Sequence, residues 1–427
     1  MNSAFNSTMD CGRGLLLGAD DLRDLAHFAK SYQRRLDQLE RAHQEGDQKA
    51  VKHCTGEILK SFGAKVCVTV RAIKLQSGQV PPTFAQIKER ADTLNPFHAI
   101  PEPVSTWLEP KIAGGCRQLV SFHRKRRALQ LMCGDILSVA YPAAPFDYSA
   151  RGKGGVKAAT IFLHKLIKEG GYQYVVTVDI KDCFGSAIKK KVGELLPLPE
   201  KVVNNVLLLQ DDVKVVVKPN QGKWTGFLYP DQLPVITSIA TDEAARRGVP
   251  QGSSASGIIM YRAVLGPLLC TLSFANRVVL VGDDLAVPVQ DKLEGDAVLE
   301  TLKSLYAASP VGLLTIGRHS LCHVKHGFDF ASYHTRLKPK WKAVLDGVME
   351  WYLHSRPTLR AYEKFEHNAA KKFHEAGGGL AGWKQVFLYM KRWMASFPLW
   401  KPNYFSKLYL WLELQAGSWH QHPKDLS

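Results

Sequence analysis

The fold is decided by the stretch Arg277-Val-Val-Leu-Val-Gly-Asp283-Asp284-Leu-Ala-Val-Pro-Val289, in which two short apolar segments flank a Gly-Asp-Asp turn. Apolar runs around so tight a turn predict a β-hairpin with two acids at its tip. A second run, Tyr174-Val-Val-Thr-Val-Asp179, predicts a buried strand that ends on a carboxylate. If these strands are neighbours in one sheet, Asp179 and Asp283 converge although they are far apart in the chain.

Carboxylates brought together in this way are suited to holding metal ions. Mg²⁺ prefers hard oxygen ligands, and in nucleotidyl transfer one ion lowers the pKa of a 3′-hydroxyl while a second neutralises charge on the triphosphate. A third segment strengthens this interpretation. The stretch Arg247-Gly-Val-Pro-Gln251-Gly252-Ser253-Ser-Ala-Ser256-Gly predicts a turn that opens a helix over Ile258 to Leu269. Backbone amides and hydroxyls in such a turn can hold a phosphate or a base pair.

The composition is that of a basic globular protein. The 427 residues include 56 Lys and Arg against 39 Asp and Glu, a net charge of +17, and 45% are hydrophobic. This composition excludes a disordered chain and a small disulfide scaffold, and the length predicts two or three packed units. The excess of positive charge favours a polyanionic partner, foremost nucleic acid, over a protein that is merely basic.

The compartment is indicated by the cysteines and by the apolar segments. The eight cysteines are scattered singly, without a Cys-x-x-Cys pair, as is typical of proteins whose thiols stay reduced. The N-terminus has no signal-peptide pattern, and no stretch approaches 18 uninterrupted apolar residues. We therefore expect a cytoplasmic protein without a membrane span.

Three further regions define the expected organisation. Residues 1–100 predict an N-terminal helical extension, because apolar residues recur every three or four positions from Leu22 to Leu39. The basic run from Arg124 to Arg127 is either a solvated helix face or a contact for phosphate groups, and both interpretations stay open. From residue 338 the chain is basic and rich in tryptophan and predicts helices, broken at Gly377-Gly-Gly379. The aromatic residues there predict either a helix-bundle core or contacts with nucleic acid.

Five segments, in this order, resemble motifs of reverse transcriptases. Thr177-Val-Asp179-Ile-Lys-Asp182-Cys-Phe184, Gly248-Val-Pro-Gln-Gly-Ser-Ser-Ala-Ser256 and Val281-Gly-Asp-Asp284 resemble motifs A, B and C. Asp147-Tyr-Ser-Ala-Arg151-Gly-Lys-Gly-Gly resembles the fingers motif, and Gly327-Phe-Asp-Phe330-Ala-Ser-Tyr333 resembles the primer grip. The resemblance is strongest to free-standing prokaryotic enzymes, the defence-associated, retron-like "unknown group" reverse transcriptases. It implies an α+β right-hand polymerase fold with fingers over 101–170, a palm over 171–337 carrying a fingers insertion around 190–245, and a basic helical thumb over 338–427.

The resemblance also implies roles for individual residues. Asp179, Asp283 and Asp284 would be the catalytic acids and would bind two Mg²⁺ ions, for which Mn²⁺ is a possible substitute. Phe184 would be the steric gate that excludes a 2′-hydroxyl and selects deoxynucleotides. Four residues would bind the incoming nucleotide, namely Gln251, Gly252, Arg151 and, less strongly, Lys153. Eight would contact nucleic acid, namely Arg124, Lys125, Arg126, Arg127, Phe330, Tyr333, Lys338 and Lys340.

The implied function is synthesis of cDNA from deoxynucleotides on a companion structured non-coding RNA, in antiviral (antiphage) defence. The alternatives are a retron-type reverse transcriptase, an RNA polymerase that uses ribonucleotides, and a non-catalytic RNA-binding scaffold. Val281-Gly282 departs from the family pattern, and Gly-Asp-Asp is also typical of viral RNA-dependent RNA polymerases, whereas Phe184 favours DNA synthesis. The template, the priming mode and the oligomeric state stay open.

Histidines between positions 319 and 326 are candidates for two further roles. Arg318 aligns with a motif D lysine that serves relatives as a general acid, but arginine barely titrates, so His319 is a second candidate for that role. A zinc site formed by His319, Cys322, His323 and His326 is set aside, because no complementary ligand pair is evident.

Overall fold

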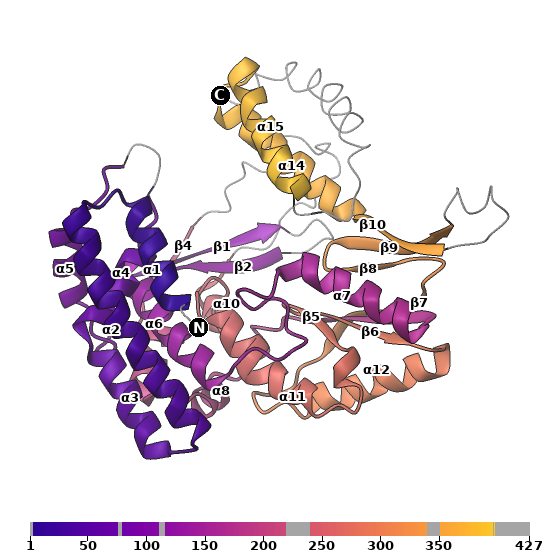
Figure 1. Ribbon diagram of the computed structural model, residues 1–427, viewed down its shortest axis with the longest axis horizontal. Coiled ribbons are helices and arrows are strands. Elements are labelled where there is room, and N and C mark those ends of the chain that lie inside the picture. The colour runs from indigo at the N-terminus through magenta and orange to yellow at the C-terminus, as the bar shows by residue number, and fades with distance from the viewer. Residues whose placement is uncertain are drawn as a thin grey trace.

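The computed structural model describes residues 3–75, 79–110, 116–218, 240–339, 351–395 and 397. Helices and three small sheets make an α+β fold, in which an N-terminal group of helices lies on one side of the sheets (Figure 1). The last two described helices, α14 and α15, lie on another side of the sheets in the same view.

Among the described helices, none is both long and apolar enough to cross a membrane. All eight cysteines are free.

The N-terminal helices follow the apolar spacing read from the sequence. They are α1 (Ser3–Gly14), α2 (Ala19–Gln44), α3 (Gln48–Lys60), α4 (Phe62–Ala72) and α5 (Phe84–Asp92). The inward face of α2 buries Leu25, Tyr32, Leu36 and Leu39, which confirms the predicted helix. The starts of α3, α4 and α5 are capped by side chains, as at Ser61, whose hydroxyl accepts a hydrogen bond from the Ala64 amide.

A buried ion pair joins this helical group to the rest of the protein. Arg71 on α4 donates through both terminal nitrogens to Asp135 on α6 (Arg124–Ala140), at 2.5 and 3.1 Å. The Tyr32 hydroxyl donates to the same carboxylate at 2.8 Å. Because the Arg71 side chain is only 8% exposed, this three-residue contact is shielded from solvent.

The central sheet has four antiparallel strands in the order β5-β6-β3-β7. They are β3 (Tyr174–Ile180), β5 (Val279–Val281), β6 (Asp284–Val289) and β7 (Ile316–His323). Side chains alternate between two faces. Val176, Val178 and Ile180 join the main hydrophobic core, with Leu302 of α12 (Lys292–Ala307), while Val175 packs with α7 (Gly155–Gly170) on the opposite face. The predicted strand and hairpin are thus confirmed.

Two smaller three-stranded sheets flank the central one. The first, in the order β2-β1-β4, contains β1 (Val104–Pro110), β2 (Cys116–Ser121) and β4 (Val215–Val217). The second, in the order β10-β9-β8, contains β8 (Phe328–Phe330), β9 (Tyr333–Pro339) and β10 (Trp351–Pro357). The helical prediction from residue 338 is therefore wrong for β10, whose seven residues pair with β9.

The remaining elements connect and cover these sheets. They are α8 (Lys189–Leu195), α9 (Glu200–Val202), the π-helix Val203–Leu207, α10 (Asp242–Arg246), the π-helix Ile258–Leu265, α11 (Gly266–Cys270), the 3₁₀ turn Ala275–Arg277, α14 (Leu359–Glu375) and α15 (Gly379–Ala395). The helix expected over Ile258–Leu269 is present, with π geometry in its first part.

The C-terminal helices break at the predicted glycines. Gly377 and Gly378 have φ values of 81° and 71° between α14 and α15. Phe365, Phe373 and Met390 form the core of this pair, and Trp383 and Trp393 pack against it, as expected for a helix-bundle core. Trp341, Trp400, Trp411 and Trp419, as well as Lys340, lie outside the described residues.

Candidate active site

The turn between β5 and β6 has two residues, Gly282 and Asp283, because Val281 pairs with Asp284 across the hairpin. Gly282 has a positive φ of 68°. Two-residue hairpin turns require a positive φ, and residues that carry a side chain rarely adopt one. The turn places Asp283 beside the end of β3, where Asp179 lies opposite Asp284 in the register. The acids that were predicted to converge therefore come from adjacent strands.

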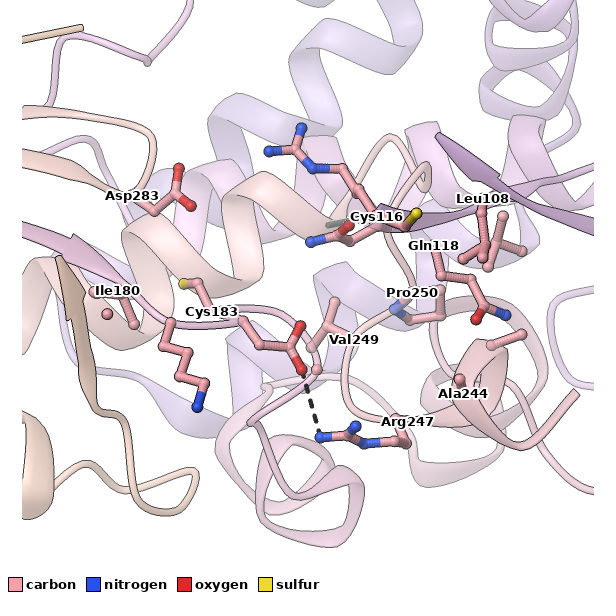
Figure 2. A pocket seen from close by; sticks show the side chains of 18 of the residues that line it. Leu108, Cys116, Gln118, Ile180, Cys183, Ala244, Arg247, Val249, Pro250 and Asp283 are labelled. Atoms are coloured by element: carbon pink, nitrogen blue, oxygen red, sulfur yellow. Dashed lines mark hydrogen bonds and ion pairs between the residues drawn. The ribbon is translucent and has the colours of Figure 1, made fainter. Parts of the chain in front are cut away.

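Asp179 and Asp283 line one cavity of about 810 Å³ (Figure 2). Its walls come from β2, from the end of β3 and the loop after it, from α10, from the turn before Gln251, and from β7. Four cations and one further acid also line it: Arg117, Lys181, Arg247, Arg318 and Asp182. The cavity thus has carboxylates on one wall and cationic side chains on the walls around them.

Arg318 on β7 holds the carboxylate of Asp179. The two residues are cross-strand partners, and the Arg318 Nη2 and Nε lie 2.9 and 3.2 Å from Asp179 Oδ2. The Arg318 side chain is 63% exposed, so the pair is screened by water and contributes little to stability. Arg318, the residue at the motif D position, therefore acts here as a partner of Asp179.

Two of the three acids fit a site for divalent cations. Asp179 and Asp283 offer carboxylate oxygens to the same cavity, and with Asp182 they raise the pKa of the neighbouring Cys183 thiol, after the larger effect of its burial. Asp284 does not line this cavity. Within the described ranges, no three His, Cys, Asp or Glu side chains form a metal-binding group, and this includes the histidine-rich segment around Cys322. The donor chemistry fits Mg²⁺, with two carboxylates of this chain as the ligands.

The turn that carries Gln251 is fixed between two other walls of the cavity. The Val249 amide donates to the Phe184 carbonyl at 2.9 Å, and the Val120 amide of β2 donates to the Gln251 carbonyl at 2.7 Å. Gly252 adopts a φ of 121°, and a Cβ there would lie 2.0 Å from the Val120 carbonyl oxygen. The glycine is therefore needed for the close approach of this turn to β2.

An aromatic pair lies behind the acids. The Phe184 and Tyr261 rings meet edge to face, with centroids 5.6 Å apart and planes at 73°. Burial raises the pKa of Tyr261, and so does the nearby charge of Asp283. Phe184 itself is half-buried and does not line the cavity, whereas its neighbours Cys183 and Gly185 do. The predicted gate thus lies against the core beside the cavity.

Other predicted nucleotide contacts lie elsewhere. Arg151 and Lys153 are on an exposed loop and do not line the cavity. Arg151 lies near α1, where its charge opposes the rise that burial causes in the pKa of Cys11. Gln251 does line the cavity, and Gly252 adjoins it.

Three of the predicted nucleic-acid contacts have side chains that are buried in this structure. Arg126 is 1% exposed and donates to the carbonyl oxygens of Asn205 and Ile100, at 2.6 and 3.4 Å. Phe330 and Tyr333 are 4% and 0% exposed, because both rings belong to hydrophobic clusters.

The other basic candidates in the described part of the chain are exposed or half-buried. Arg124 is exposed on the first turn of α6, Lys125 and Arg127 are half-buried, and so is Lys338 on β9.

Arg117 and Tyr261 were missed by the sequence reasoning. Arg117 lies on β2, lines the cavity, and is close enough to Tyr261 for its charge to oppose the rise in the tyrosine's pKa. Each is a single residue in an apolar or mixed segment, so neither shows a local pattern. The pairing of β1 with β2 carries Arg117 to the cavity, and this contact is seen only in the folded structure.

Comparisons with known proteins give distant structural similarities. No protein-family model matches the chain, and no curated protein matches its sequence. Similar solved structures are telomerase from Candida albicans in complex with a fragment of telomeric RNA, the sicinivirus 3Dpol RNA-dependent RNA polymerase, and apo telomerase from Candida tropicalis truncated from its C-terminal domain.

Sequence identities to the three are 14%, 14% and 12%, with TM-scores of 0.34, 0.35 and 0.33. The matches cover 56%, 74% and 63% of this chain, and 44%, 68% and 63% of the other chains, in the same order. The chain thus spans less than half of the Candida albicans chain. At these TM-scores we assign neither a family nor an activity from the three structures.

Proposed function

We propose that this protein is a template-directed nucleic-acid polymerase, and specifically an RNA-directed DNA polymerase that uses two divalent metal ions. The observation that carries the proposal is the convergence of Asp179 and Asp283, from adjacent antiparallel strands, on a cavity with a cationic surround. The order of the sequence motifs that resemble reverse transcriptases supports the same activity. In this proposal the fingers are residues 101–170, the palm 171–337 and the thumb 338–427.

The charged residues at the acidic end of the cavity have distinct roles in the proposed mechanism. Asp179 and Asp283 would hold the Mg²⁺ ions, with Asp284 as an accessory acid on the neighbouring strand. When bound, these ions would acidify the attacking 3′-hydroxyl and neutralise the departing pyrophosphate. Arg117, whose planar guanidinium suits bidentate contact with phosphate, would grip the triphosphate in place of Arg151.

The remaining walls would position the nucleotide. Gln251 faces the cavity from a turn that hydrogen bonds hold to β2 and to the Phe184 carbonyl, so it would support the incoming base or sugar. Arg318 donates to Oδ2 of Asp179 and would orient this carboxylate, which Asp179 would also offer to a metal ion. Phe184, braced by Tyr261, would exclude ribonucleotides by limiting the space beneath the sugar.

The partner proposed from the resemblance and from the net charge of +17 is a companion structured RNA that serves as template. The product would be cDNA, and the process would serve antiphage defence, a role that rests on the resemblance alone. A polymerase that uses ribonucleotides is the second candidate, favoured by one observation: Phe184 does not line the cavity.

The test is incorporation of labelled nucleotides by the purified full-length protein on an RNA template with a DNA primer and Mg²⁺. We expect incorporation of deoxynucleotides, abolished by Asp283→Asn and unchanged by Asp296→Asn, which alters an exposed acid on α12. Phe184→Ala should admit ribonucleotides. A preference of the unaltered protein for ribonucleotides would establish the second candidate, and RNA binding without any incorporation would refute both.

A further inference from the structure

One face of the second small sheet carries a concentrated group of cations. On β9, His334, Arg336 and Lys338 alternate with Tyr333, Thr335 and Leu337, and the latter three contribute to buried clusters or buried hydrogen bonds. On β10, Tyr352, His354 and Arg356 alternate with Leu353 and Ser355 in the same way. Successive side chains point to opposite faces of a sheet. The three polar or aromatic residues named first for each strand therefore lie together on the outer face.

The register brings the side chains of the two strands together in three cross-strand pairs. Arg356 pairs with His334, Arg336 pairs with His354, and Lys338 pairs with Tyr352. We call these six residues the β9–β10 basic face. Arg336, Arg356 and Tyr352 are exposed, and His334, Lys338 and His354 are half-buried.

Such an arrangement destabilises the isolated sheet. Arg336, Lys338 and Arg356 carry like charges on one face of the sheet, and like charges that lie so close together repel each other. Burial lowers the pKa of Lys338 and of His354, and the neighbouring Arg336 and Arg356 lower both further. Of the acids in the described part of the chain, Asp329 lies close to this face, 2.7 Å from His334 Nδ1. A polyanion bound to this face would relieve the repulsion.

The spacing and the aromatic residue favour nucleic acid as the polyanion. Alternate residues on a strand are about 7 Å apart, and neighbouring strands are about 4.8 Å apart, so the cations form a compact grid. Tyr352 is 38% exposed and its ring lies edge to face with that of His354, 6.3 Å between centroids. Exposed aromatic rings among cations stack on unpaired bases while the cations contact phosphates.

We propose that the β9–β10 basic face is a binding site for single-stranded RNA, separate from the active-site cavity. None of its six residues lines that cavity. Of them only Lys338 was expected to contact nucleic acid, and the face adds two arginines, two histidines and a tyrosine. The site does not depend on the proposed polymerase activity, because binding can be measured without catalysis.

The test measures binding of the full-length protein to a labelled, unstructured oligoribonucleotide at several salt concentrations. For single strands, the logarithm of the association constant falls with the logarithm of salt by about 0.7 per phosphate contact. The double variant Arg336→Gln/Arg356→Gln should therefore reduce the slope by about 1.4, and should weaken binding on the order of tenfold at 150 mM salt. The matched control is Lys49→Gln/Lys52→Gln, which removes two exposed cations from α3 and should change neither quantity.

Two further measurements separate a binding site from a structural effect. The arginine variant should unfold at an equal or higher denaturant concentration, because it removes like-charge repulsion. Tyr352→Ala should weaken RNA binding with the salt slope unchanged, and Tyr352→Phe should restore the affinity, because a phenylalanine ring also stacks.

An unchanged slope in the arginine variant would overturn the proposal, as would equally strong, arginine-dependent binding to phosphatidylserine vesicles. Asp283→Asn should bind RNA like the unaltered protein, so failure of the polymerase proposal would leave this result intact.

Discussion

Gly252→Ala tests whether the turn that carries Gln251 must contact β2 for the cavity to exist. The added Cβ would lie 2.0 Å from the Val120 carbonyl oxygen, and a φ of 121° is strained for alanine. The strain costs about 1–3 kcal/mol. Separation of the two segments would also break the hydrogen bond from the Val120 amide to the Gln251 carbonyl and leave a buried donor unpaired, at about 1–3 kcal/mol. We expect a loss of about 2–6 kcal/mol in the free energy of unfolding, measured by urea denaturation.

Two other glycines separate the contributions to this loss. Gly152 has a φ of 83° and nothing within 4 Å of an added Cβ, so Gly152→Ala should show backbone strain alone, about 1 kcal/mol. Gly56 lies within α3 with open space around it, so Gly56→Ala should stabilise the protein by about 0.5–1 kcal/mol. Gly252→Ala should also raise KM for the nucleotide, because the turn that carries Gln251 would no longer be held against the strand that carries Arg117. If its unfolding free energy matched that of Gly152→Ala, the proposed contact with β2 would be refuted.

Three other perturbations follow from contacts described above. Asp135→Asn should cost about 3–5 kcal/mol in urea denaturation, because it leaves the buried Arg71 guanidinium without its carboxylate; an unchanged midpoint would contradict this. Burial, followed by the charge of His354, lowers the pKa of His164 to about 4. The unfolded chain therefore binds more protons between pH 6.5 and 4, and stability should fall on acidification by up to about 3 kcal/mol, a dependence that His164→Gln should reduce. Tyr261→Phe should keep the preference for deoxynucleotides, measured as a ratio of kcat/KM values, whereas Tyr261→Leu should reduce it about tenfold by removing the ring that braces Phe184; equal ratios in both variants would exclude that bracing role.

The parts of the site that were predictable are those set by short-range geometry. The strand ending at Asp179 and the two-residue turn before Asp284 follow from apolar runs and a glycine, and these signals lie within a few residues of the acids. The sequence also contained a signal that was overlooked at Arg126. It lies three and seven positions before Leu129 and Cys133, on the buried face of α6, so helical spacing predicts a buried side chain there.

The rest depends on packing between distant segments. Arg117 reaches the cavity only because the β1–β2 hairpin lies against the turn at Gln251, through the bond from the Val120 amide. Tyr261 meets Phe184 because the π-helix Ile258–Leu265 packs beneath the loop after β3. The strand β10 was mistaken for a helix because its aromatic and basic residues were read as part of a helical thumb, whereas its pairing with β9 determines its structure.

The different origins of acids and cations explain why one set was found and the other was not. The acids share one sheet, so the register that pairs Asp179 with Asp284 brings them together even before other elements pack. Arg117 comes from another sheet and Arg247 follows α10, so they reach the same cavity only after the Gly252 turn has docked on β2. A substitution that undocks this turn should therefore displace Arg117 and Arg247 and leave the acids, with Arg318 on the same sheet, in place. If the proposed function holds, the cavity would then keep its carboxylates, and with them the proposed binding of divalent ions, after the proposed grip of Arg117 on a triphosphate had been lost.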